Sequence, residues 1–280
     1  MSTTAIAHQH PDLHAMWDAV APGWDAHAPF VEARGAVVSA RMLELVAPDS
    51  GDRVLELGCG TGGPGFAAAA LVAPGGDVVV SDVSPAMVAA AARRAPAGVR
   101  TCVLDLERID EPDGAFDVVL CREALMLVAD PARGAREIRR VLRPGGRLAL
   151  SVWGPRARTP WLGVVFDVVG AQLGVPMPPP GTPHPFSLDD GDRVAELLRD
   201  AGLAGVEVSE LDTPYRAASV DEWWQRTAAL AGPLARRLAA LPPAAANELR
   251  DRAADAAAPY LTPAGLEFPG VSLLASARRS

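Results

Sequence analysis

The chain has 280 residues and a formal net charge of −8, with 49% hydrophobic and 21% charged residues, as in folded soluble domains. All 26 basic residues are arginine, so a P-loop and a lysine Schiff base are excluded, and the acidic balance disfavours a nucleic-acid partner. No apolar run reaches the length of a membrane span, and no secretory signal is expected from the N-terminus. Three scattered cysteines, Cys59, Cys102 and Cys121, indicate a reducing, cytoplasmic location.

The expected elements alternate between strands and helices in the first half of the chain. Residues 11–48 are expected to be helical, with a break at Pro22-Gly23. Ser84 as N-cap and Pro85 as first helical residue begin a later helix. The expected strands are 53–57, 78–82, 100–106, 116–121 and 147–153, and the other helices are 66–72 and 131–142. This alternation predicts a parallel sheet with helices on both faces.

The pattern changes after Trp153, where longer helical segments and a proline-rich loop appear. Ser187 is expected to cap a helix over 187–203. The remaining elements are helical segments at 159–175 and 219–262, a loop at 176–185, and strands at 206–211 and 270–278. More than fifty apolar, alanine-rich residues separate the last two strands, so 214–266 is predicted to form a helical cap. The last strand must return to the same sheet, which predicts a single domain.

Five glycines crowd the stretch VLELGCGTGGPG, residues 54–65, directly after the first expected strand. Glycine has no side chain, so such a loop allows a ligand to approach the backbone closely. Gly58, Gly60 and Gly63 satisfy G-x-G-x-x-G, and Asp82 ends the next strand, where a ribose-binding acid is expected. Taken alone, this pattern fits NAD, FAD, S-adenosylmethionine (SAM) or a tight packing of helix on strand.

Five segments resemble the motifs of class I SAM-dependent methyltransferases, in the order of that family. They are ELGCGTG from Glu56, SDVSPAMV from Ser81, LDL from Leu104, FDVVLCREALMLVADP from Phe116 and REIRRVLRPGGRLALSVW from Arg136. The match covers about residues 50–153, and the overall resemblance is to the ubiquinone/menaquinone C-methylases. It implies an α/β enzyme with a Rossmann-like, doubly wound, mostly parallel seven-stranded sheet, an antiparallel last strand and helical cap insertions. It also implies SAM as cofactor and S-adenosylhomocysteine as product.

The resemblance implies a cofactor site around the glycine loop. Asp82 would accept hydrogen bonds from two ribose hydroxyls, Asp105 would accept one from the adenine amine, and Glu56 would place negative charge near the ammonium. Trp24 belongs to a segment that closes over the cofactor in similar enzymes, and its indole suits a sulfonium; packing on the core is the alternative. The predicted cofactor-binding residues are Glu56, Gly58, Cys59, Gly60, Gly62, Asp82, Val83, Met87, Asp105, Leu106, Cys121 and Trp24.

Arg122 and Glu123 are the polar residues that follow the fourth expected strand. We expect Glu123 to face the acceptor as a candidate base, and Arg122 to pair with a nearby carboxylate or steer an anionic substrate group. A surface salt bridge is the alternative for both. Met126 and Leu127 stand where the quinone C-methylases often carry paired histidines, which counts against a quinone precursor as acceptor.

Aromatic and histidine residues in the N-terminal segment, and in or beside the segments added after the core, are candidates for an acceptor pocket, with core or cap packing as the alternative. They are Trp17, His27, Trp153, His184, Tyr215 and Trp223. No metal is expected, because neither zinc spacing nor clustered Asp and Asn is present.

We therefore expect a methyltransferase acting on a small-molecule acceptor, without nucleic-acid or membrane partners, and leave open a homodimer. A methyltransferase of protein or tRNA and a non-catalytic SAM-binding regulator are the alternatives, and O, N, C and S remain open as the methylated atom. The expected division is a lid at 1–48, a SAM-binding core at 50–153, cap and acceptor segments at 154–186 and 214–266, and sheet-completing segments at 187–213 and 267–279.

Overall fold

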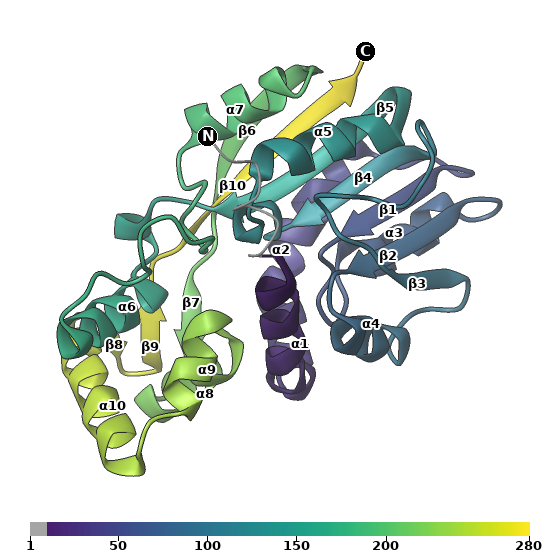
Figure 1. Cartoon of the computed structure of the whole chain (residues 1–280). Coiled ribbons are helices and arrows are strands. Elements are labelled where there is room, and N and C mark those ends of the chain that lie inside the picture. The colour runs from purple at the N-terminus through teal and green to yellow at the C-terminus, as the bar shows by residue number, and fades with distance from the viewer. Residues whose placement is uncertain (1–9) are drawn as a thin grey trace.

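A seven-stranded sheet forms the centre of the computed structural model, which describes residues 10–280 (Figure 1). Its strand order is β3-β2-β1-β4-β5-β10-β6. The strands are β1 (Arg53–Leu57), β2 (Asp77–Asp82), β3 (Val99–Val103), β4 (Phe116–Arg122), β5 (Leu142–Trp153), β6 (Leu203–Asp212) and β10 (Val271–Arg279). Neighbours among β1 to β5 pair in parallel, whereas β10 runs antiparallel to both β5 and β6. The predicted fold class, with its antiparallel last strand, is confirmed.

Helices cover both faces of this sheet, because its central strands are apolar on both sides. On one face lie α2 (Ala28–Val46), α3 (Pro64–Val72) and α4 (Pro85–Ala92). On the other lie α5 (Pro131–Val141) and α7 (Gly191–Asp200). None of the helices within residues 10–280 is both long enough and apolar enough to cross a membrane.

Two helix boundaries differ from those expected. Helix α1 (His10–Ala26) runs through Pro22, and the break between α1 and α2 falls at His27. Pro29 lies in the first turn of α2, where proline favours the start of a helix over its interior. Helix α7 begins after Asp190, whose side chain accepts a hydrogen bond from Arg193 N. The hydroxyl of Ser187, the expected cap, instead accepts a hydrogen bond from His184 N in the preceding turn.

The cap contains the helices predicted for 214–266 and also a small sheet, which the sequence analysis did not predict. Its helices are α6 (Pro160–Leu173), α8 (Val220–Leu230), α9 (Pro233–Ala239) and α10 (Pro243–Ala257), and its strands are β7 (Tyr215–Ala217), β8 (Leu261–Thr262) and β9 (Gly265–Phe268). Three short 3-10 helices, η1 (Leu125–Leu127), η2 (Arg156–Arg158) and η3 (Ala258–Tyr260), complete the elements. Tyr215 pairs with Phe268 across β7 and β9, so aromatic packing favours strands where alanine content suggested helix.

The N-terminal helix α1 lies between α4 and the cap (Figure 1). Asp25 forms 2.6 Å ion pairs with Arg93 and Arg94 at the end of α4. On the cap side, Gly23 lies against the backbone of Ala229, where a β-carbon at Gly23 would be only 2.6 Å from the carbonyl oxygen. The helix therefore connects the core to the cap.

Two adjacent tryptophans of α8 allow a test of the cap's packing. Trp223 is fully buried, and its Nε1 donates a 3.0 Å hydrogen bond to Trp161 O, whereas Trp224 is half-buried. We expect Trp223→Ala to lower the free energy of unfolding by about 3–5 kcal/mol, as for other buried aromatic residues. Trp224→Ala should cost about 1 kcal/mol. Chemical denaturation measures both; equal losses would contradict this packing.

Candidate active site

The glycine loop after β1 has a backbone that requires glycine at specific positions. Gly58 and Gly60 have φ values of +66° and +56°, which side-chain-bearing residues rarely adopt. A β-carbon at Gly58 would lie 2.3 Å from Ala124 Cβ, and one at Gly63 would lie 1.9 Å from Glu56 Oε1. The loop thus packs directly against the residues that follow β4, which brings the first and fourth motifs together.

Asp82 at the end of β2 holds this loop in place. Its Oδ2 accepts a 2.9 Å hydrogen bond from Gly60 N, and its Oδ1 accepts one of the same length from Ser84 N. Burial raises the pKa of this carboxyl, although the backbone hydrogen bonds act in the opposite direction. Each carboxylate oxygen has a second lone pair, so both can still accept a ribose hydroxyl.

Glu56 lies beneath the glycine loop, with 1% of its surface exposed. Its Oε2 accepts a 2.8 Å hydrogen bond from Gly65 N at the start of α3. Burial raises the pKa of Glu56 to about 7, while Arg122 and the Gly65 N–H lower it. The carboxylate therefore has a structural contact with the loop in addition to the charge expected near a ligand ammonium.

Arg122 at the end of β4 contacts both α2 and the glycine loop. Its guanidinium donates hydrogen bonds to Ser39 Oγ at 2.8 Å, Glu32 Oε1 at 2.7 Å and Gly62 O at 3.3 Å. The side chain is only 9% exposed. Of its two expected roles, pairing with a carboxylate is the one this geometry supports.

Glu123 adopts φ +55°, an unusual backbone conformation for a residue other than glycine. Its N–H donates a 2.8 Å hydrogen bond to Ser151 O, and its Oε2 lies 3.6 Å from Arg34 NH1. The Arg34 guanidinium in turn lies over the rings of Trp153 and Trp161, at 5.3 and 5.1 Å from their centroids. Sequence reasoning missed Arg34, because it lies far from every recognised motif.

The lid helix α1 places one predicted aromatic residue beside the glycine loop. A β-carbon at Gly60 would lie 3.5 Å from the Trp24 ring, and Trp24 packs edge-to-face on Trp17 at 6.3 Å. Trp24 Nε1 and Thr61 Oγ1 are buried and have no hydrogen-bond partner among residues 10–280. The Thr61 hydroxyl was not anticipated; its position inside the glycine motif was the available signal.

Asp105 faces the same lid. Its Oδ1 accepts a 2.8 Å hydrogen bond from Glu107 N, and its Oδ2 lies 3.8 Å from His14 Nε2 of α1. A second lid contact, also missed from the sequence, lies nearby: Asp18 Oδ1 accepts hydrogen bonds from Ser84 Oγ at 2.8 Å and Ala86 N at 2.9 Å. The lid is therefore bonded to the segments that carry both predicted cofactor carboxylates.

Most of the remaining predicted cofactor-binding residues are buried and apolar. The buried ones are Cys59, Met87, Leu106 and Cys121, and Val83 is half-buried beside Asp82. Burial raises the pKa of the Cys121 thiol to about 12 and that of Cys59 well above its usual value, so neither is a thiolate nucleophile.

The structure brings two of the predicted acceptor-site residues together and leaves the other four at separate places. Trp153 and Tyr215 are brought together through Trp161, whose ring lies 4.9 Å from Trp153 and stacks on Tyr215 at 4.7 Å. Trp17 lies against Gly232 of the cap, His27 lies at the junction of α1 and α2, and His184 lies in a loop where its Nδ1 accepts a hydrogen bond from Phe186 N. Trp223 lies in the cap core with its indole N–H bonded, so packing alone accounts for it.

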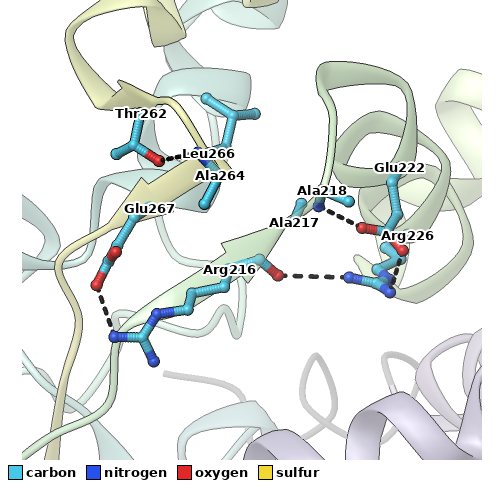
Figure 2. Close-up of a pocket in the computed structure, with 9 residues that line it drawn as sticks. All are labelled: Arg216, Ala217, Ala218, Glu222, Arg226, Thr262, Ala264, Leu266 and Glu267. Atoms are coloured by element: carbon cyan, nitrogen blue, oxygen red, sulfur yellow. Dashed lines mark hydrogen bonds and ion pairs between the residues drawn. The ribbon is translucent and has the colours of Figure 1, made fainter.

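A hollow of about 320 Å³ lies on the cap, and no residue of the glycine loop lines it (Figure 2). Its charged groups bind one another: Arg216 pairs with Glu267 at 2.6 Å, and Glu222 pairs with Arg226. No predicted site residue lines it, and we do not assign it to the chemistry.

Comparisons with known proteins agree with this geometry. A family model described as "Methyltransferase domain" matches residues 55–150. Nocamycin O-methyltransferase of Saccharothrix syringae is 37% identical over 202 residues, covering 66% of this chain and 70% of that protein. The ubiquinone biosynthesis O-methyltransferase of Xanthomonas euvesicatoria pv. vesicatoria (strain 85-10) is 35% identical over 174 residues, covering 60% of this chain and 69% of that protein.

A solved structure shares the fold. The Haemonchus contortus phosphoethanolamine N-methyltransferase 2, in complex with phosphomonomethylethanolamine and S-adenosylhomocysteine, superposes with a TM-score of 0.52 at 19% identity, covering 86% of this chain and 52% of that one. The chain belongs to the class I SAM-dependent methyltransferase family. The predicted family, enzyme class and SAM cofactor are confirmed, while the roles of individual site residues stay predictions.

Removing the Asp82 carboxylate tests the cofactor site. We expect Asp82→Ala to weaken SAM binding by about 10- to 150-fold, corresponding to about 1.5–3 kcal/mol for charge-assisted hydrogen bonds. Asp77→Ala, at the opposite end of the same strand, is the matched control and should leave the affinity unchanged. Calorimetry with SAM measures both, and wild-type affinity in folded Asp82→Ala would contradict the assignment.

The raised pKa of Glu56 predicts a proton linked to cofactor binding. A cation bound nearby favours the ionised carboxylate, so SAM should release a proton, and affinity should rise as pH increases toward about 7, by up to about tenfold per unit, and level off above it. In the ligand-free protein, burial favours the neutral form, so this group's stabilising contribution is lost as pH rises from 4.5 through about 7.

Calorimetry near neutral pH in two buffers of different ionisation enthalpy measures the released proton. Glu56→Gln should abolish the buffer dependence, and the same proton release in that variant would assign it to another group.

Proposed function

We propose that this enzyme methylates an oxygen of a small-molecule acceptor enclosed between the lid, the core and the cap. The contact between α1 and the cap supports this most directly. A β-carbon at Gly232 would lie 3.2 Å from Trp17 Cη2, and Gly23 packs on Ala229, so the lid and cap meet beside the glycine loop. Such enclosure suits a small acceptor and excludes water from the site. The two relatives named O-methyltransferases favour oxygen as the methylated atom.

The residues around the glycine loop fit SAM. The Trp24 ring lies beside Gly60, and the buried, unpartnered Thr61 Oγ1 and Trp24 Nε1 are available donors at this loop. We propose that Asp82 and Asp105 bind the ribose and adenine, with Trp24 covering the loop. SAM supplies a methyl group on a sulfonium, which is already activated for displacement.

The contribution of the chain is then mainly positioning, which can supply on the order of 7–11 kcal/mol when reactants are held at attack distance. Glu123, held near Arg34, would accept a proton from an acceptor that arrives neutral. We propose a lid at 1–48, of which residues 1–9 lie outside the described part of the chain, and a core at 50–153. The cap segments are 154–186 and 214–266, extended by β9 to Phe268, and 187–213 completes the sheet with the last strand.

The location and assembly also belong to this proposal. Cys59, Cys102 and Cys121 are all unpaired in the structure, which suits a reducing cytoplasm. The homodimer remains open, and size-exclusion chromatography with light scattering measures it directly.

The test of the proposed function is turnover of labelled SAM against panels of metabolites, bacterial protein and tRNA. Label transfer to a small molecule supports the proposal. Transfer only to protein or tRNA would instead assign a macromolecular acceptor, and tight SAM binding without transfer to any panel would assign a regulator.

A variant of Glu123 then tests its role. With the acceptor found by that panel, Glu123→Gln should keep SAM affinity and lower kcat by roughly 10²–10⁴, with partial recovery at higher pH. A loss confined to KM would make Glu123 a substrate-orienting residue. Glu44→Gln, which changes an exposed ion pair with Arg41 on α2, is the control and should keep full activity. Full activity of Glu123→Gln would mean that Glu123 forms only a structural salt bridge and is not a base.

A further inference from the structure

Beyond the end of β5, a positive charge is surrounded by aromatic rings. We call Arg34, Trp153, Trp161 and Tyr215 the arginine–indole cluster. The guanidinium carbon of Arg34 lies 5.3 Å from the Trp153 ring centroid and 5.1 Å from that of Trp161, and Tyr215 stacks on Trp161 with an interplanar angle of 14°. The three aromatic residues come from β5, α6 and β7, so the core and the cap build the cluster together.

Each member of the cluster has a buried polar atom without a hydrogen-bond partner among residues 10–280: Arg34 Nε, Trp153 Nε1, Trp161 Nε1 and Tyr215 Oη. The aromatic side chains are 9%, 6% and 1% exposed, in the order Trp153, Trp161 and Tyr215. Arg226 lies near the Tyr215 hydroxyl and lowers its pKa, whereas burial raises that pKa to about 12. An unpaired buried polar group costs about 1–3 kcal/mol, so several together call for a specific partner.

Two residues near the cluster have their buried polar groups paired. Trp223, equally aromatic and fully buried, bonds its Nε1 to Trp161 O at 3.0 Å. Arg122, which also contacts α2, makes hydrogen bonds of 2.7 and 2.8 Å with its side-chain partners. Within residues 10–280, the carboxylate that pairs with Arg34 is that of Glu123, at 3.6 Å, which is longer than a hydrogen bond.

The unpaired groups are donors, apart from the hydroxyl of Tyr215, which can also accept. A ligand that satisfies them must offer hydrogen-bond acceptors, and the guanidinium favours acceptors that carry negative charge. The flat rings of Trp153, Trp161 and Tyr215 favour a planar group beside them. Oxygen atoms on a conjugated plane meet all three requirements.

We infer that the arginine–indole cluster binds the methyl acceptor through a planar, acidic enol or phenol held as its oxygen anion. This rests on the proposed function, because it names the acceptor class of that same site. Arg34 of the cluster lies 3.6 Å from Glu123, and the next residue, Ala124, contacts Gly58. The cluster therefore adjoins the glycine loop.

With such an acceptor, the bonds and charges of the methyl transfer balance. The anionic oxygen forms the new O–C bond as the C–S bond of the sulfonium breaks, and the anion and cation become a neutral ether and a neutral thioether. An acceptor that enters as the neutral enol first gives its proton to Glu123. Arg34 stabilises the oxygen anion and thereby increases the fraction that is ready to attack.

Two probes of nearly the same shape test the charge requirement. Cyclohexane-1,3-dione is an enolate near neutral pH, and its O-methyl ether, 3-methoxycyclohex-2-enone, is neutral. We expect protein loaded with S-adenosylhomocysteine to bind the enolate at least about tenfold more tightly than the ether, measured by quenching of tryptophan fluorescence and by ligand-detected NMR.

Arg34→Gln should reduce this preference to about twofold, while Arg34→Lys, which keeps the charge without the planar fork, should retain part of it. The matched control is Arg41→Gln on the same helix, where an exposed ion pair with Glu44 is lost and the preference should persist. Calorimetry should show unchanged S-adenosylhomocysteine affinity in every variant, which confirms that the protein is folded.

Equal affinity for both probes, no binding of the enolate at millimolar concentration, or an unchanged preference in Arg34→Gln would overturn the inference. These outcomes leave the proposed function intact if labelled SAM still methylates a small molecule without an acidic enol or phenol. Loss of SAM binding by the wild-type protein would overturn the proposed function itself.

Discussion

The buried guanidinium of Arg122 is the interaction on which the arrangement of the site depends. A charge removed from water must be paired, and the partners of this one come from α2 and from the glycine loop. Gly35 of α2 lets the side chain pass, since a β-carbon there would lie 2.3 Å from Arg122 NH1. Desolvation alone would lower the pKa of Arg122, but the charges of Glu32, Glu56 and Glu123 raise it, so the group stays charged. The end of β4, α2 and the loop are thus held as one unit.

This network also relates the two halves of the site. Helix α2 supplies Glu32 and Ser39 to Arg122, and it supplies Arg34 to the arginine–indole cluster. The same helix therefore fixes the glycine loop and carries Arg34, the positive charge that we propose binds the acceptor. A movement of α2 would alter both together. Helix α1 instead contacts Ser84 through Asp18 and Asp105 through His14, on the side where we propose that the ribose and adenine bind.

The parts of this structure that could be predicted from sequence are those determined by residues close together in the chain. Strand β1 has the predicted bounds, because RVLEL is apolar and lies between turn residues, and Ser84 caps α4 as predicted, with its Oγ accepting from Met87 N. The glycine loop was recognisable for the same reason. The Arg34–Glu123 contact joins residues that are distant in sequence, and neither residue alone shows a pattern that requires the other. The small cap sheet was missed because its strand pairing is non-local, while its composition resembles the helices around it.

The adjacent residues Arg122 and Glu123 show how a local rule fails in an informative way. Successive side chains of a strand point to opposite faces of the sheet. Both side chains instead contact α2, because Glu123 leaves the strand with φ +55° while its N–H stays bonded to Ser151 O. A left-handed conformation costs roughly 1–2 kcal/mol for a residue with a β-carbon. With this conformation, Arg122 stays buried against the glycine loop while the Glu123 carboxylate turns toward Arg34.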